Sequence, residues 1–152
     1  MNKLDYLRMR SELRAYLIAR APNLRIDHNF GGLYQAATAC DRMRWFYCAI
    51  QEKTFGRNWA KQYDRPWPVA YGSREHPNSN PHYHLVVNAC PILTAAIIKE
   101  GPELWLEKVP HGQLYVQHIA PGDDGPVIYR TKHLTHAQAW EDLFVYSDTR
   151  GR

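Results

Sequence analysis

Two strand-like segments separated by a short turn restrict the fold more than any other part of this chain. The first is PVAYGSRE (68–75) and the second is PHYHLVVNA (81–89). Both are rich in the β-branched and aromatic residues that favour strands. The segment between them, HPNSNP, concentrates Pro, Asn and Ser, which are turn-forming residues. Because two strands joined by a short turn pair as an antiparallel hairpin, the sequence predicts a hairpin here.

The rest of the chain alternates between helical and strand-like patterns. Apolar residues recur at helical spacing over residues 3–20, and loops are expected at 21–23 and 28–32. We predict helices over 33–43, 92–100 and 127–136, a helix or loop over 52–66, and further strands over 44–51, 112–119 and 143–147. This order predicts an α+β fold: a central antiparallel sheet of four to five strands flanked by helices.

Composition favours one globular domain without a membrane span. The chain has 152 residues, 45% hydrophobic and 22% charged, so we expect a single domain over 1–152, with 1–40 as an N-terminal helical extension. No apolar run approaches the length of a membrane-spanning helix, and the charged N-terminus lacks the apolar core of a signal peptide. Three scattered cysteines argue against a disulfide framework, so we expect a cytoplasmic protein. The net charge of +4 is compatible with binding nucleic acid.

The second strand of the hairpin begins with two histidines. Alternate residues of a strand point to the same face, so His82 and His84 project together and Tyr83 projects to the other side. Two neutral imidazoles side by side form half of a metal site. In the predicted hairpin, Glu75 lies beside His82, because cross-strand neighbours are about 5 Å apart. Two imidazoles and one carboxylate suit Mg²⁺ or Mn²⁺, with His76 as the competing third ligand if the register differs.

A second group of polar residues follows the loop APGDDGP. In the segment Tyr129-Arg130-Thr131-Lys132, residues three apart share one face of a helix, so Tyr129 and Lys132 project together. A phenol is a poor nucleophile at neutral pH. A neighbouring ammonium group and a bound metal ion would help it to attack a phosphate.

Together these two segments resemble a known enzyme family. "PHYHLVV" is similar to the His-hydrophobe-His motif of HUH endonucleases, and "LYVQHIAPGDDGPVIYRTKHL" is similar to the strand, loop and Tyr-x-x-Lys helix of rolling-circle replication initiators. The resemblance covers residues 44 to 134 and extends to the replication proteins of filamentous phages and small plasmids. Two departures are notable. The family's first-strand motif is not clear in this chain, where "WFYCAIQ" is a plausible occupant, and His133 stands where many relatives carry an aromatic residue.

The resemblance implies a fold and a reaction. The two histidines would lie on a middle strand of the sheet, and a tyrosine would attack single-stranded DNA with the help of Mg²⁺ or Mn²⁺. Carried over, His82, His84 and Glu75 would bind the metal, Tyr129 would be the nucleophile, and Lys132 would assist it. The product would be a 5′-phosphotyrosine bond and a free 3′-hydroxyl. The substrate would be single-stranded DNA at an origin or hairpin, and a host helicase would be a partner.

Cations and tryptophans suggest a surface for single-stranded DNA, which requires basic and aromatic groups. Trp59 and Trp67 are either stacking platforms or core residues. We expect Arg44, Arg74 and Arg130 to contact DNA, among a wider set of candidate cations: Arg42, Arg57, Lys61 and Arg65.

Three alternatives remain open from the sequence. A single-tyrosine HUH transposase would use the same groups, although the lysine one turn after Tyr129 favours an initiator. A histidine-triad hydrolase would need a further histidine at Val86. A catalytically silent DNA-binding module would keep the same scaffold.

Overall fold

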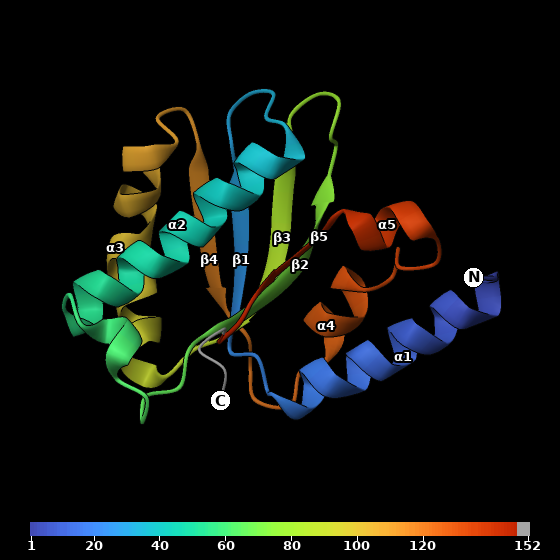
Figure 1. The fold of residues 1–152 in the computed structure, drawn as a ribbon, viewed down its shortest axis with the longest axis horizontal. Helices are drawn as coiled ribbons and strands as arrows, with labels where there is room; N and C mark the ends of the chain where they lie inside the picture. The colour runs from blue at the N-terminus through green and yellow to red at the C-terminus, as the bar shows by residue number, and fades with distance from the viewer. Residues whose placement is uncertain (149–152) are drawn as a thin grey trace.

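A computed structural model describes residues 1–148 as an α+β fold with a five-stranded antiparallel sheet in the order β4-β1-β3-β2-β5 (Figure 1). The strands are β1 (Leu24–Asn29), β2 (Val69–Glu75), β3 (His82–Asn88), β4 (Gln113–His118) and β5 (Leu143–Tyr146). The helices are α1 (Lys3–Ala19), α2 (Ala36–Phe55), α3 (Pro91–Lys108), α4 (Gly125–Arg130) and α5 (Ala137–Glu141), with a 3-10 helix η1 (Trp59–Lys61). The predicted fold class is confirmed. No helix within residues 1–148 is long and apolar enough to cross a membrane.

The predicted hairpin is present with the expected register. In β2 and β3, Glu75 pairs with His82 and Ser73 pairs with His84. Gly72 lies opposite Leu85, and a Cβ at this position would overlap the backbone carbonyl oxygen of His84. A glycine is therefore required here for the two strands to approach each other.

The two faces of the sheet have different coverings. Tyr83, Leu85 and Val87 of β3 are buried in the main core, where α2 and α3 pack against the sheet. The opposite face carries His82 and His84, and we call it the histidine face. A smaller apolar cluster covers part of that face, with residues from α1, the sheet, α4 and the segments that follow β4 and α4: Leu17, Tyr71, Val86, Ile119, Val127 and Leu134. In Figure 1, α2 and α3 lie next to each other, while α1, α4 and α5 gather on the other side of the molecule.

Two elements differ from the sequence-based prediction. The segment 44–51, expected to be a strand, is part of α2, so "WFYCAIQ" does not occupy a first strand. The aromatic content of 44–51 suggested a strand. The buried residues of α2 nevertheless recur at helical spacing, so one face of the helix packs into the core: Ala39, Met43, Phe46, Tyr47 and Ile50. The first strand is instead β1, part of which was expected to be a loop.

The other boundaries differ in length. Helix α3 continues to Lys108, well beyond the predicted end at residue 100, although it contains Pro102. Helix α4 ends at Arg130, whereas the prediction extended it to residue 136. Turns follow it, so Lys132 lies just beyond the helix.

The missed strand β1 places a histidine in the core. His28 is fully buried among Phe46, Tyr47 and Trp105, with ring centroids 5.3, 5.8 and 4.5 Å away. Its Nε2 lies 3.2 Å from the hydroxyl of Tyr47. Burial, opposed only partly by the charge of Asp27, lowers the pKa of His28 to about 3. The imidazole is therefore neutral in the folded protein at neutral pH.

We predict that His28 contributes to acid instability. Its pKa is about 3 in the folded state and 6.5 in the reference state, so the unfolded chain binds a proton first as the pH falls. The free energy of unfolding should decrease between pH 6.5 and 3, by up to about 1.4 kcal/mol per pH unit. Denaturant titrations at several pH values should give a shallower pH dependence for His28→Phe than for the wild type. Parallel curves would contradict the assignment.

Candidate metal centre and tyrosine site

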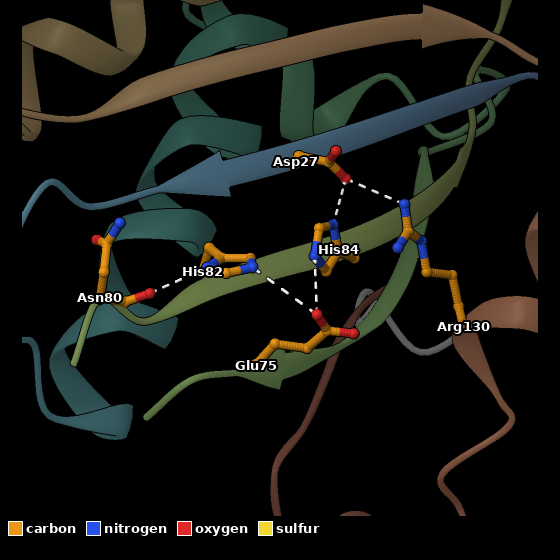
Figure 2. A network of polar contacts seen from close by, with 6 residues as sticks. All are labelled: Asp27, Glu75, Asn80, His82, His84 and Arg130. Atoms are coloured by element: carbon orange, nitrogen blue, oxygen red, sulfur yellow. Dashed lines mark hydrogen bonds and ion pairs between the residues drawn. The ribbon is translucent and has the colours of Figure 1, made fainter. Parts of the chain in front are cut away.

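Glu75, His82 and His84 converge on the histidine face of the β2–β3 hairpin. The Glu75 Oε2 atom lies 3.2 Å from His84 Nε2 and 3.8 Å from His82 Nε2 (Figure 2). The two imidazole rings meet edge to face with centroids 4.7 Å apart. All three side chains are largely buried, yet each remains partly open to solvent. The register and the alternation of the strands therefore bring the three predicted ligands together.

Both histidines have their Nδ1 atoms occupied by oxygen acceptors. His82 Nδ1 lies 2.9 Å from the carbonyl oxygen of Asn80, and His84 Nδ1 lies 2.7 Å from Oδ1 of Asp27 (Figure 2). A carbonyl or carboxylate oxygen can only accept, so each Nδ1 carries the proton. The Nε2 atoms face Glu75 and are the ring nitrogens left to bind a metal ion. An oxygen acceptor behind the ring is the arrangement found for histidines that bind metals.

His76 lies in the same cluster. One ligand atom each from Glu75, His76 and His82 fits within 4.8 Å, and the His76 and His82 rings are 5.2 Å apart. His76 is exposed and has a positive φ of 51°, which turns the chain at the end of β2. Glu75 belongs to both possible ligand sets, while His84 contacts Glu75 directly. Two imidazoles and a carboxylate form a donor set that could hold a divalent metal ion.

Asp27 completes this centre and was not predicted from the sequence. It lies on β1 directly opposite His84 and accepts hydrogen bonds from His84 and from Arg130 Nη2, the latter at 3.1 Å. Burial alone would raise the pKa of Asp27, but the hydrogen bond from His84 and the electrostatic attraction of His84, Arg130 and Arg25 lower it. The carboxylate therefore stays ionised at neutral pH. The alternation of LRIDHN, with Leu24, Ile26 and His28 buried, was the signal that could have placed Asp27 on this face.

Tyr129 and Lys132 lie together, as predicted, even though Lys132 falls outside the helix. Lys132 Nζ is 3.6 Å from the centre of the Tyr129 ring. Tyr129 is half exposed, with 50% of its surface accessible to solvent. The guanidinium carbon of Arg130 lies 5.3 Å from the same ring. Two cations therefore lie within cation–π distance of the Tyr129 ring.

The three arginines predicted to contact DNA do not form one exposed surface. Arg44 is exposed but lies on α2, on the far side of the sheet from the histidines, within 3.7 Å of Asp41. Arg74 pairs with Asp142 at 2.7 Å and is largely buried. Arg130 pairs with Asp27 and is only 5% exposed. The structure therefore gives Arg74 and Arg130 internal partners.

The two tryptophans proposed as stacking platforms pack against the fold. Trp59 and Trp67 are partly buried, with ring centroids 4.9 Å apart. Trp67 also stacks on Tyr146 of β5 at 5.9 Å, with the rings nearly parallel. Of the two interpretations, the structure favours a packing role for this pair.

Helix α1 holds α4 from the side opposite the sheet. Arg14 Nε donates to the hydroxyl of Thr131 at 2.6 Å, and Arg14 Nη2 donates to the carbonyl oxygen of Ile128 at 3.2 Å. Arg10 Nη1 donates to the carbonyl oxygen of Lys132 at 3.1 Å. Two of these bonds supply donors to carbonyl groups at the C-terminal end of α4 and just beyond it, where intrahelical donors are lacking. The N-terminal segment, to which the sequence assigned no role, therefore braces the helix that carries Tyr129.

We predict that Arg14→Met loosens α4. The variant loses two hydrogen bonds from a charged donor, each worth about 1.5–3 kcal/mol at most. Hydrogen–deuterium exchange of residues 125–132 should become faster. The matched control is Arg8→Met, because Arg8 is exposed on the same helix and pairs with Glu12, with no hydrogen bond to α4 among residues 1–148. Equal exchange in the two variants would show that α1 does not brace α4.

Comparisons with protein-family models, with curated proteins and with solved structures found no match to this chain. A functional assignment must therefore start from the site itself. Its main features are a carboxylate that faces two histidines, each held by an oxygen acceptor at Nδ1, and a half-exposed tyrosine beside a lysine.

Proposed function

We propose that this protein is a single-tyrosine HUH endonuclease of the kind that initiates rolling-circle replication. The observation that carries the proposal is the way in which the two histidines are held. Both Nδ1 atoms hydrogen-bond to oxygen acceptors, and both Nε2 atoms face Glu75. Histidines that bind metals almost always have such an acceptor behind the ring.

In this proposal, Tyr129 is the nucleophile. Its hydroxyl oxygen attacks the phosphorus of a single-stranded DNA phosphodiester as the phenol gives up its proton. The bond between phosphorus and the 3′-oxygen breaks, and that oxygen takes up a proton. The products are a 5′-phosphotyrosine bond and a free 3′-hydroxyl, and the reverse reaction rejoins the strands. Lys132, 3.6 Å from the ring, stabilises the charge that develops on the phenol oxygen.

Glu75, His82 and His84 would hold the divalent ion, with His76 as a further ligand available from the turn. A bound Mg²⁺ or Mn²⁺ ion would supply Lewis-acid polarisation of the scissile phosphate. Because the cluster and Tyr129 are linked through Asp27 and Arg130, the attacked phosphate would lie between them. The lysine after Tyr129 favours an initiator over a single-tyrosine transposase. We propose that a host helicase unwinds the duplex.

We predict that Tyr129→Phe abolishes covalent attachment to DNA. The protein would be incubated with Mn²⁺ and pools of labelled single-stranded oligonucleotides and then run on denaturing gels. The wild type should give a slowly migrating band, and Tyr129→Phe should give none because it lacks the attacking oxygen. Tyr115→Phe is the matched control, because Tyr115 is also exposed and lies opposite Asp27 on β4. A band that survives in Tyr129→Phe would move the nucleophile elsewhere.

We also predict that His84→Ala and Glu75→Gln bind Mn²⁺ at least tenfold more weakly than the wild type, because each removes a ligand. Titration calorimetry would measure the affinity without any DNA. His111→Ala is the control, since this histidine is exposed and belongs to no such cluster in residues 1–148. Unchanged Mn²⁺ affinity in both ligand variants would refute the metal centre and favour a silent DNA-binding module.

A further inference from the structure

One carboxylate links the histidine cluster to the helix that carries Tyr129. Oδ1 of Asp27 accepts a hydrogen bond from His84 Nδ1 at 2.7 Å and another from Arg130 Nη2 at 3.1 Å (Figure 2). Arg130 follows Tyr129 directly in α4, and its guanidinium carbon lies 5.3 Å from the Tyr129 ring. A continuous set of contacts therefore joins His84, Asp27, Arg130 and Tyr129 across three elements of the fold.

The burial of this network makes its geometry hard to change. The side chains of Arg130, His84 and Asp27 are only 5, 17 and 21% exposed. Removing one partner of a largely buried charge pair leaves the other charge uncompensated, which is far more costly than losing an exposed ion pair. The ion pair with Asp27 therefore fixes the position of Arg130, because breaking it would leave a largely buried charge without a partner.

We propose that Asp27 and Arg130 are positioning residues that tie the metal centre to the nucleophile. Asp27 orients the His84 ring so that Nε2 faces Glu75. Arg130 uses the same carboxylate to hold α4, and with it Tyr129, at a fixed place beside the cluster. The role given to Tyr129 rests on the function proposed above, whereas the effects on His84 and on α4 do not.

The two residues should have separable effects. Arg130→Met keeps the hydrogen bond between His84 and Asp27 but releases α4. We expect its Mn²⁺ affinity to stay within threefold of the wild type, while exchange of residues 125–132 becomes faster and adduct formation slows at least tenfold. Asp27→Asn removes the charge that both partners share. Its Mn²⁺ affinity should fall 10–100-fold, as for other residues behind metal-binding histidines, and α4 should also exchange faster.

Arg25→Met is the matched control. Arg25 lies on β1 two residues before Asp27 and points to the same face, and its charge also lowers the pKa of Asp27. It is exposed, and no hydrogen bond to Asp27 is present in the described part of the chain. It therefore removes a nearby positive charge without breaking the link. We expect wild-type Mn²⁺ affinity and wild-type exchange of α4.

Calorimetry, hydrogen exchange and single-turnover adduct formation at saturating DNA would be measured on these three variants and on Arg130→Lys, with circular dichroism to confirm folding. Arg130→Lys should recover part of the lost rate, because it keeps the charge. Wild-type Mn²⁺ affinity in Asp27→Asn, or α4 exchange in Arg130→Met equal to that in Arg25→Met, would overturn the proposal. If the wild type formed no adduct but the calorimetry and exchange results held, the positioning roles would stand and the proposed nuclease function would fall.

Discussion

The alternation of side chains along β3 between the two faces of the sheet determines where the candidate site can form. The strand lies at the centre of the sheet, paired on both sides, so its residues must divide strictly between two faces. Tyr83, Leu85 and Val87 enter the core under α2 and α3. His82 and His84 are thereby fixed on the opposite face. A slip of one residue in register would bury the imidazoles and expose the apolar side chains, so the core specifies where the histidines stand.

The two strands beside β3 each place a carboxylate next to the histidines. Glu75 comes from β2 and Asp27 from β1, so carboxylates lie on both sides of the central strand. They have different tasks: Glu75 faces the Nε2 atoms, while Asp27 binds the Nδ1 proton of His84. In water such an arrangement would be weak, but partial burial strengthens each contact. Arg130 balances the charge of Asp27 and brings α4 to the same place.

The sequence predicts the parts of the site whose residues lie close together along the chain. His82, His84 and Glu75 follow from a short hairpin, and Tyr129 with Lys132 from a spacing of three residues. Asp27 could not be obtained in this way, because its partner lies 57 residues away and because β1 was partly taken for a loop. The error at 44–51 has a related cause. Aromatic residues favour strands, but packing against the sheet selects the helix α2, and no local pattern of composition reveals that contact.

The positions of the arginines show that net charge does not predict a DNA-binding surface. Arg74 and Arg130 suggested a basic surface for DNA, yet both are largely buried and paired with carboxylates. A net charge of +4 says nothing about which cations are free to bind a partner. Arg10 and Arg14 lie in an N-terminal segment to which the sequence assigned no role, and they donate hydrogen bonds to the end of α4 and the residues just after it.

We propose that Tyr129 attacks DNA next to a metal ion bound by the histidine cluster. Peptide mapping of the covalent adduct would identify the residue that carries the DNA. Protein that has reacted with single-stranded DNA and Mn²⁺ would be digested with nuclease and trypsin and then analysed by tandem mass spectrometry. Cleavage after Lys108 and Arg130 releases residues 109–130, which contain both Tyr115 and Tyr129. If Tyr129 is the nucleophile, a nucleotide will be attached to Tyr129 and none to Tyr115. A nucleotide on any other residue would contradict it, as would the same yield when Mn²⁺ is replaced by a chelator.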